Sequence, residues 1–233
     1  MKLGLLGDIH GNHRALRAVL NAAKAENVER LLITGDFVGY YFDPAKVLEL
    51  LNEWDYIAVR GNHEEMLCAV RHNPATLASV TTRYGCGTKV ALEQLDSGQL
   101  DELCNLPHPL LLELDGLGVL LSHGSPWDLN RYVYPDADPS LFMRCAAEGH
   151  DLVVMGHTHH PMRKDLEKTT LVNPGSVGQP RDRNPSAAWA LFDTSTRQLT
   201  FRRERYDQRM LIAECLCRHP ELPYLAEVLE RKQ

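Results

Sequence analysis

The 233-residue sequence lacks any long hydrophobic run. No stretch approaches the roughly 20 consecutive apolar residues that a membrane-spanning helix needs. The first residues offer only a short apolar run before an Asp and a His, whereas the apolar part of a secretory signal needs roughly 7 to 15 residues. The sequence therefore predicts no membrane partner and no export signal, and we expect a cytoplasmic protein.

Positive charge and paired cysteines are also lacking. The chain has 25 Lys plus Arg against 31 Asp plus Glu, a formal net charge of -6, so we expect no stable nucleic-acid partner. None of the cysteines forms a C-x-x-C pair, which argues against a thiolate zinc site and against a disulfide framework. We expect reduced thiols at Cys68, Cys86, Cys104, Cys145, Cys215 and Cys217.

The composition that is present fits one globular core. At 44% hydrophobic and 24% charged residues, 233 residues suffice for one domain and are few for two. We therefore expect a single domain over residues 1–233, in which about 206–233 forms a mainly helical C-terminal tail. The sequence leaves the oligomeric state open.

Short apolar runs alternate with segments of helical periodicity over the first 60 residues, which predicts an α/β fold with a largely parallel early sheet. Further along, the pattern of residues 77–105 predicts helices with breaks at Gly85 and Gly87. The pair Asp115-Gly116 predicts a hairpin turn. The expected strands are Leu3–Leu6, Leu31–Thr34, Tyr56–Val59, Leu110–Leu114, Gly118–Ser122, Leu152–Met155, and an antiparallel group of Thr169–Val172, Ala187–Phe192 and Leu199–Arg203.

Polar clusters follow five of these expected strands. Because the carboxyl ends of parallel strands share one edge of a sheet, these clusters should meet there. Residues two apart in extended backbone project to the same side, so the two side chains of each D-x-H or H-x-H pair can bind metal together. Imidazole and carboxylate without thiolate suit Mn, Fe, Zn, Ni or Co. The clusters are Asp8-Ile9-His10, Gly35-Asp36, Gly61-Asn62-His63-Glu64, His123-Gly124 and Gly156-His157-Thr158-His159.

The series D-x-H, G-D, G-N-H-E, H-G and G-H-x-H, in this order, resembles the signature of calcineurin-like metallophosphoesterases from about residue 3 to residue 192. The segments GDFVGYYFDP, SHGSPWD, MGHTHHP and VNPGSVGQPRD are similar to the small bacterial and archaeal phosphodiesterase branch, which includes dinucleoside polyphosphate hydrolases. The resemblance implies a four-layer αββα sandwich of two mixed sheets flanked by helices. It also implies hydrolysis of a small phosphoester or nucleotide substrate.

The resemblance implies two divalent metal ions, with manganese favoured. It assigns Asp8, His10, Asp36 and His159 to the first ion, and Asp36, Asn62, His123 and His157 to the second, with Asp36 and a hydroxide as bridges. That hydroxide would attack the phosphorus in line. His63 is implied as the leaving-group acid or charge stabiliser.

Asn12 and Arg60 are candidates for binding phosphate oxygens, Arg60 because its planar guanidinium suits that geometry. Simpler interpretations remain open for single residues: Asn62 can cap the following helix instead of binding metal, and Arg60 can be an ordinary surface cation.

Two other functions remain open. One is a protein Ser/Thr phosphatase, although the chain has Gly39 and Tyr40 where those enzymes carry an Asp and an Arg, so the Asp that would orient His63 is missing. The other is a non-catalytic interaction scaffold, which the same fold provides where the ligands have decayed. Loop aromatics at Tyr40, Tyr41, Phe42, Trp127, Tyr132 and Tyr134 can either stack a base or pack the loops.

Overall fold

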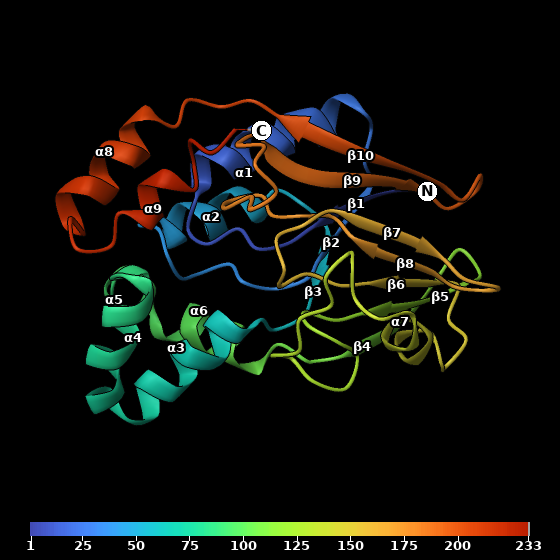
Figure 1. Cartoon of the computed structure of the whole chain (residues 1–233), viewed down its shortest axis with the longest axis horizontal. Helices are drawn as coiled ribbons and strands as arrows, with labels where there is room; N and C mark the ends of the chain where they lie inside the picture. Colours follow the sequence, from blue (N-terminus) through green and yellow to red (C-terminus); the bar gives the residue numbers. More distant parts are fainter. Residues whose placement is uncertain (233) are drawn as a thin grey trace.

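The computed structural model describes residues 1–232, which form two mixed β-sheets stacked face to face (Figure 1). The first sheet has the order β10-β9-β1-β2-β3 and the second the order β4-β5-β6-β8-β7, with five strands each. The first contains β1 (Lys2–Leu6), β2 (Arg30–Ile33), β3 (Tyr56–Ala58), β9 (Ala187–Asp193) and β10 (Gln198–Glu204). The second contains β4 (Leu110–Leu114), β5 (Leu117–Leu121), β6 (Leu152–Val154), β7 (Met162–Asp165) and β8 (Thr170–Asn173).

Helices occupy both outer faces and one end of the stacked sheets. They are α1 (His13–Ala25), α2 (Pro44–Leu51), α3 (Asn62–His72), α4 (Leu77–Tyr84), α5 (Gly87–Gln94), α6 (Ser97–Asn105), α7 (Pro139–Cys145), α8 (Arg209–Arg218) and α9 (Tyr224–Glu227), with a 3₁₀ turn at Pro74–Thr76. The helical segment predicted over residues 77–105 is confirmed. Gly85 ends α4, while Gly87 is the first residue of α5.

Alternating side chains build the layers. Leu3 and Leu5 of β1 lie in the core between the two sheets, whereas Leu6 belongs to the core beneath α1 and α2. On the outer face of the second sheet, Val153 packs with Phe142 of α7. The order helix, sheet, sheet, helix confirms the predicted four-layer α/β sandwich.

The sheet pairings confirm most of the expected strand order and correct one part of it. β1, β2 and β3 are parallel, β4 and β5 form the hairpin at Asp115-Gly116, and β9 and β10 are antiparallel. The prediction that β8 belongs to an antiparallel group with β9 and β10 is wrong, because β8 pairs parallel to β6 in the other sheet. The reversal is made by β7, an edge strand with a single buried residue, Met162, and therefore with no periodic apolar signal.

The C-terminal segment contains α8 and α9, and Pro220 and Pro223 lie between them. Both helices pack onto the segment after β2, where Tyr41 and Phe42 share their hydrophobic cluster. The Tyr41 hydroxyl donates a hydrogen bond to the Leu225 carbonyl at 3.1 Å. Residue 233 lies outside the described part of the chain.

The expectation of reduced thiols is wrong for one pair. Cys68 of α3 and Cys104 of α6 form a disulfide, with their Cα atoms 5.7 Å apart. The two helices pack side by side, which the 36-residue separation of these cysteines in the sequence does not reveal. The disulfide fastens α6 to the helix that begins with Asn62 and His63.

Among residues 1–232, no helix combines the length and the apolarity that crossing a bilayer would require.

Candidate metal centre

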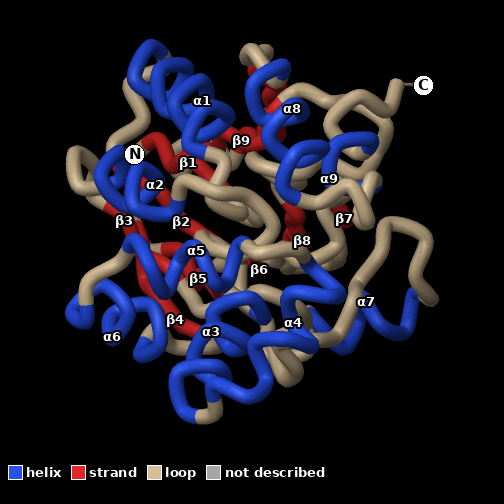
Figure 2. Tube along the Cα trace, turned by 90° about the vertical axis from the view of Figure 1, so that its left-hand side faces the viewer, coloured by secondary structure: helices blue, strands red, loops and turns tan. Residues whose placement is uncertain are grey.

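The polar clusters at the strand ends meet at one edge of the sandwich. Parallel pairing of β1 with β2, and of β5 with β6, places the carboxyl ends of these strands together. Figure 2 views this edge, where loops fill the centre between α1, α8 and α9 above and α3 and α4 below. The geometry therefore gathers segments that are far apart in the sequence.

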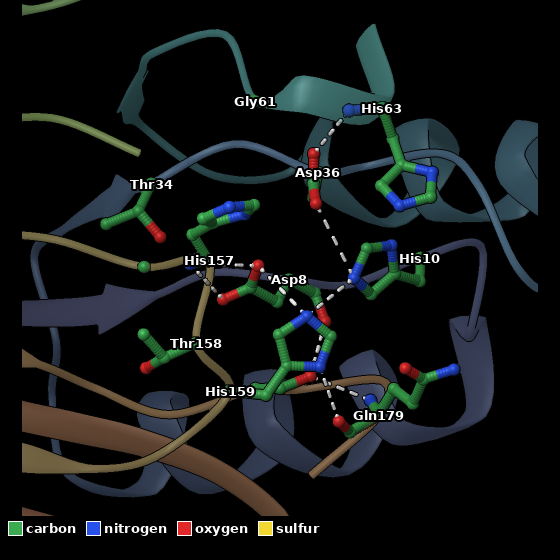
Figure 3. A network of polar contacts seen from close by, with 12 residues as sticks. Asp8, His10, Thr34, Asp36, Gly61, His63, His157, Thr158, His159 and Gln179 are labelled. Atoms are coloured by element: carbon green, nitrogen blue, oxygen red, sulfur yellow. Dashed lines mark hydrogen bonds and ion pairs between the residues drawn. The ribbon is translucent and has the colours of Figure 1, made fainter. Parts of the chain in front are cut away.

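Four of the seven predicted ligands form a compact buried group. One ligand atom from each of Asp8, His10, Asp36 and His159 lies within 4.8 Å of the others. The Nε2 atoms of His10 and His159 are 3.1 Å apart, and His159 Nε2 lies 3.4 Å from Asp8 Oδ1 (Figure 3). All four side chains are buried.

The remaining three predicted ligands gather around His123. Its Nε2 lies 2.9 Å from Asn62 Oδ1 and 3.1 Å from His157 Nδ1. Asp36 joins the two groups, because its Oδ2 is 3.6 Å from His10 Nε2 and 3.5 Å from His123 Nε2. Asn62 is the first residue of α3 and Gly61 is its N-cap, so the capping alternative for Asn62 is not what the structure shows.

Backbone carbonyls set the orientation of each imidazole. The Nδ1 atoms of His10 and His123 contact the carbonyls of Val38 and Thr34 at 3.1 and 2.7 Å. Since a carbonyl only accepts, these Nδ1 atoms carry the hydrogen and Nε2 presents a lone pair. His159 follows the same rule with the Gln179 carbonyl at 2.6 Å, while His157 is reversed and contacts the Asn130 carbonyl through Nε2 at 3.2 Å.

This pattern fits a bound cation. With the hydrogens on the outer nitrogens, the facing nitrogens of His10 and His159 are both acceptors, as are those of His123 and His157. Neither pair has a hydrogen between its two nitrogens, and buried carboxylates lie against both. Acceptors that converge in this way repel one another unless a positive ion lies between them. The donor set is that of a divalent metal site without thiolates.

The pKa values of these buried side chains also fit a site for a cation. Burial raises the pKa of Asp8 to about 8 and raises the pKa of Asp36 well above its ordinary value, the latter with help from the nearby Glu64 and Asp8 carboxylates. It lowers the pKa values of His10, His123 and His159 well below the ordinary range. Without a cation the group favours neutral acids and neutral imidazoles, and a divalent ion would favour the carboxylates.

The backbone of the ligands departs from the prediction. The two-residue spacing of Asp8 with His10, and of His157 with His159, was expected to act in extended backbone. Instead all four residues have positive φ, between 53° and 69°, and so does Asp36 at 57°. Non-glycine residues adopt this left-handed conformation at a cost, and such residues cluster at functional sites. β1 ends at Leu6 and β6 at Val154, two and three residues before Asp8 and His157, and the chain then turns sharply.

Glu64 is a site residue that sequence reasoning did not single out as functional. Its buried carboxylate accepts hydrogen bonds from the backbone N–H groups of Asp36, Phe37, Val38 and Gly61, at 2.8 to 3.2 Å. It thereby ties the loop after β2 to the start of α3. The signal available was a Glu three residues after the N-cap glycine, a position from which its carboxylate can accept the N-cap N–H.

The three other predicted site residues differ in their surroundings. The His63 backbone N–H donates to Asp36 Oδ1 at 2.9 Å, and its ring lies 4.8 Å from that of His10, so His63 borders the ligand group. The Asn12 side-chain amide donates to the Gly178 carbonyl and to the Tyr206 hydroxyl, and its Oδ1 caps α1. The Arg60 guanidinium donates to the Cys104 carbonyl at 3.1 Å, at the end of α6.

The comparisons with known proteins agree with this geometry. Residues 1–197 match the family model described as the calcineurin-like phosphoesterase superfamily domain. The chain belongs to this superfamily. Its members are metal-dependent, so the predicted enzyme class, a phosphoric ester hydrolase, is confirmed at the level of the family.

Individual relatives match over most of the chain. The phosphodiesterase YfcE of Escherichia coli is 29% identical over 83% of this chain and 88% of its own. A bis(5'-nucleosyl)-tetraphosphatase of Photorhabdus laumondii is 32% identical over 55% of this chain and 47% of its own. The crystal structure of a metallophosphoesterase from Sphaerobacter thermophilus is 28% identical with a TM-score of 0.75, and the match covers 99% of this chain and 98% of that one. The predicted similarity to the small phosphodiesterase branch is confirmed.

Proposed function

We propose that this chain is a phosphodiesterase that binds two divalent ions, manganese first among the candidates, and hydrolyses a small or nucleotide-like phosphodiester. The observation that carries the proposal is the position of Asp36 Oδ2, between the Nε2 atoms of His10 and His123 at 3.6 and 3.5 Å. A carboxylate oxygen placed between two sets of inward lone pairs is suited to bridging two cations. The similarity to a phosphodiesterase of E. coli supports diester cleavage.

The proposed ligand sets follow the two groups around Asp36. Asp8, His10, Asp36 and His159 hold one ion, and Asp36, Asn62, His123 and His157 hold the other. Bound divalent ions supply the lowered pKa of an attacking water and positive charge for the phosphate oxygens. The carbonyls of Val38, Thr34, Gln179 and Asn130 keep the ring nitrogens aligned, as outer hydrogen-bond partners of metal ligands commonly do.

His63 is proposed to act on the leaving oxygen. Hydrolysis forms one P–O bond from water and breaks one ester P–O bond, so the departing oxygen must gain a proton. Burial lowers the pKa of His63 to about 3, with smaller contributions from Arg181 and His157, so the free ring is neutral. A neutral imidazole carries one N–H, which donates a hydrogen bond to the developing charge on the leaving oxygen, while the proton that the attacking water loses completes the alcohol.

The protein phosphatase alternative is disfavoured by the surroundings of His63. Its Nδ1 is buried and has no hydrogen-bond partner within the described residues. A Cβ atom added at Gly39 would collide with this nitrogen, so the position holds no room for an Asp side chain as the backbone stands. The carboxylate that would orient the ring in such a phosphatase has no counterpart here.

The loop aromatics divide into two groups that bear on the substrate. Tyr40, Tyr41 and Phe42 are buried and pack their loop, whereas Tyr132 and Tyr134 are exposed. The Tyr132 ring stacks on that of His157, with centroids 3.9 Å apart and an interplanar angle of 19°. The Tyr134 ring is in turn stacked with that of Tyr132, and a pair of exposed aromatic rings beside a proposed ligand supports a substrate with a planar group, such as a nucleotide base.

We also propose that the chain is one domain, with the C-terminal tail as part of it. Val90 of α5 lies in the same hydrophobic cluster as Leu211 and Leu225 of the tail. The tail thus packs onto the loop that carries Tyr40 and Tyr41, next to the candidate metal centre.

The test is hydrolysis of bis-p-nitrophenyl phosphate and p-nitrophenyl phosphate by metal-stripped protein, with and without added Mn²⁺, beside an Asp36→Asn variant. We expect metal-dependent diester cleavage, near two bound ions per chain by elemental analysis, and loss of both in the variant. Bound metal with no cleavage of any phosphoester, nucleotides included, would favour the scaffold alternative instead.

A further inference from the structure

Arg181, in the loop between β8 and β9, is a partly buried cation without a carboxylate partner. Within residues 1–232, no carboxylate oxygen lies within 4.0 Å of its guanidinium. Its Nη2 donates to the Tyr40 hydroxyl at 2.9 Å and to Gln179 Oε1 at 2.8 Å, and its Nε donates to Gln179 Oε1 at 3.2 Å. A guanidinium that leaves bulk water normally pairs with an anion.

The charge of Arg181 lies beside the candidate metal centre. Burial is the larger cause of the pKa shifts nearby, but the charge of Arg181 opposes the rise at Asp8 and adds to the fall at His63 and His159. The two residues that hold its guanidinium also touch the centre. Gln179 supplies the carbonyl that orients His159, at 2.6 Å, and the Tyr40 ring lies 4.6 Å from both His10 and His63. Tyr40 and Gln179 therefore fix Arg181 against the same rings that surround the ligand group.

A cation in this place repels divalent ions, so its presence needs a compensating interaction. Arginine has five N–H donors, and the contacts with Tyr40 and Gln179 use those on Nη2 and Nε. No hydrogen bond from Nη1 occurs within the described residues, so two donors remain for a ligand. An anion that contacts both the metal ions and Nη1 would offset the repulsion. Arg60, the cation predicted for this role, instead donates to the Cys104 carbonyl.

We propose that Arg181 binds a non-bridging oxygen of the substrate's phosphate group, and that Tyr40 and Gln179 are its positioning residues. This inference rests on the proposed function. It places the phosphate against the candidate metal centre on the side where Tyr40 and Gln179 hold Arg181, with His63 nearby.

The decisive measurement is the equilibrium binding of inorganic phosphate to the metal-loaded protein by titration calorimetry. We expect Arg181→Gln to bind phosphate about 10-fold to 100-fold more weakly, because it loses a hydrogen bond between charged groups. Arg181→Lys should recover part of the affinity, because it keeps the charge and loses the planar fork. Arg183→Gln is the matched control, an exposed arginine in the same loop, and should bind phosphate as the wild type does.

The metal content must stay unchanged in Arg181→Gln, measured by elemental analysis. Tyr40→Phe provides a second test: it removes one contact of Nη2 with little change of shape. We expect weaker phosphate binding and a raised KM, with kcat, metal content and Tm near those of the wild type.

The inference is overturned if Arg181→Gln binds phosphate as tightly as the wild type. It is also overturned if that variant loses its metal ions, which would make Arg181 a structural support, or if the wild type binds no phosphate. Failure of the proposed function has a different signature. A wild type that binds phosphate through Arg181 and cleaves no ester would leave the anion site in place without the enzyme.

Discussion

The backbone of His63 contacts one proposed metal ligand, and its ring packs against two neighbouring rings. Its N–H donates to Asp36 Oδ1, while its ring packs between those of His10 and Tyr40. None of these contacts uses its ring nitrogens, so the side chain can be removed without breaking a hydrogen bond of the ligand group. The roles of metal ligand and hydrogen-bond donor to the leaving oxygen are therefore separable by mutation.

We predict that His63→Ala retains the metal ions and lowers kcat by about 10²-fold to 10³-fold, the usual effect of removing a hydrogen-bond donor to a developing negative charge. Elemental analysis and steady-state kinetics on a diester check this. His72→Ala is the matched control, since His72 lies exposed on the same helix. Loss of metal from His63→Ala would show that the residue is a ligand.

The pKa shifts predict a pH dependence of the metal-free protein. Asp8 has a pKa of about 8 when folded and 3.8 in the unfolded reference, so the folded state binds its proton more tightly. The stability that this proton contributes is lost as the pH rises toward 8. The buried imidazoles act oppositely, but only below 6.5, the unfolded pKa of histidine.

Between about pH 6.5 and 8 the carboxylates alone determine the trend. We expect the Tm of chelator-treated protein to fall across this window, and the fall to be smaller in Asp8→Asn and in metal-loaded protein. A Tm that rises with pH in metal-free wild type would contradict this reading of the buried acids.

At the scale of elements, the loop after β2 and the start of α3 behave as one unit. The Glu64 carboxylate joins them through four backbone N–H groups, and the disulfide from Cys68 to Cys104 fastens the same helix to α6. Asp36, Asn62 and His63 all lie on the joined segments. Their relative placement therefore depends on a residue that contacts no proposed metal ion.

We predict that Glu64→Gln lowers the free energy of unfolding by about 2 to 4 kcal/mol, because the amide NH₂ would face backbone donors in a buried place. Metal affinity should fall as well. Glu65→Gln is the control, because Glu65 is exposed and lies next in the sequence. Urea unfolding of both variants checks the difference, and equal stabilities would remove Glu64 from this role.

The elements themselves were largely predictable, and the details of the site were not. Hydrophobic runs followed by Asp, His or Asn predicted the strands that end in polar clusters. The positive φ values of Asp8 and His157 could not be foreseen, because their sequence neighbours are equally compatible with extended backbone. α7 was missed although Asp138-Pro139 carries an N-cap and a first-turn proline. Arg181 was missed because only the fold brings it to Tyr40.

At the scale of the whole molecule, the C-terminal helices complete the core around the candidate centre. Leu225 of α9 is fully buried with Tyr41 and Phe42, whereas Leu216 of α8 is 51% exposed. The tail therefore contributes to the stability of the same unit that carries the site.

We predict that Leu225→Ala lowers the free energy of unfolding by about 2 to 5 kcal/mol, as is usual for a buried leucine, and that Leu216→Ala changes it little. A single cooperative transition in chemical denaturation should move with Leu225→Ala. If the two variants were equally stable, the tail would be an appendage and the single-domain proposal would fail.

The ligand group draws on distant parts of the chain, which bears on when metal can be acquired. Asp8 follows β1, the first strand, while His159 follows β6 and depends on the Gln179 carbonyl for its orientation. During synthesis the early residues leave the ribosome long before these partners exist, and β1 must also wait for β9 as its sheet neighbour. Metal loading is therefore expected after release of nearly the whole chain, which makes the finished fold, and not the nascent peptide, the form that selects its ion.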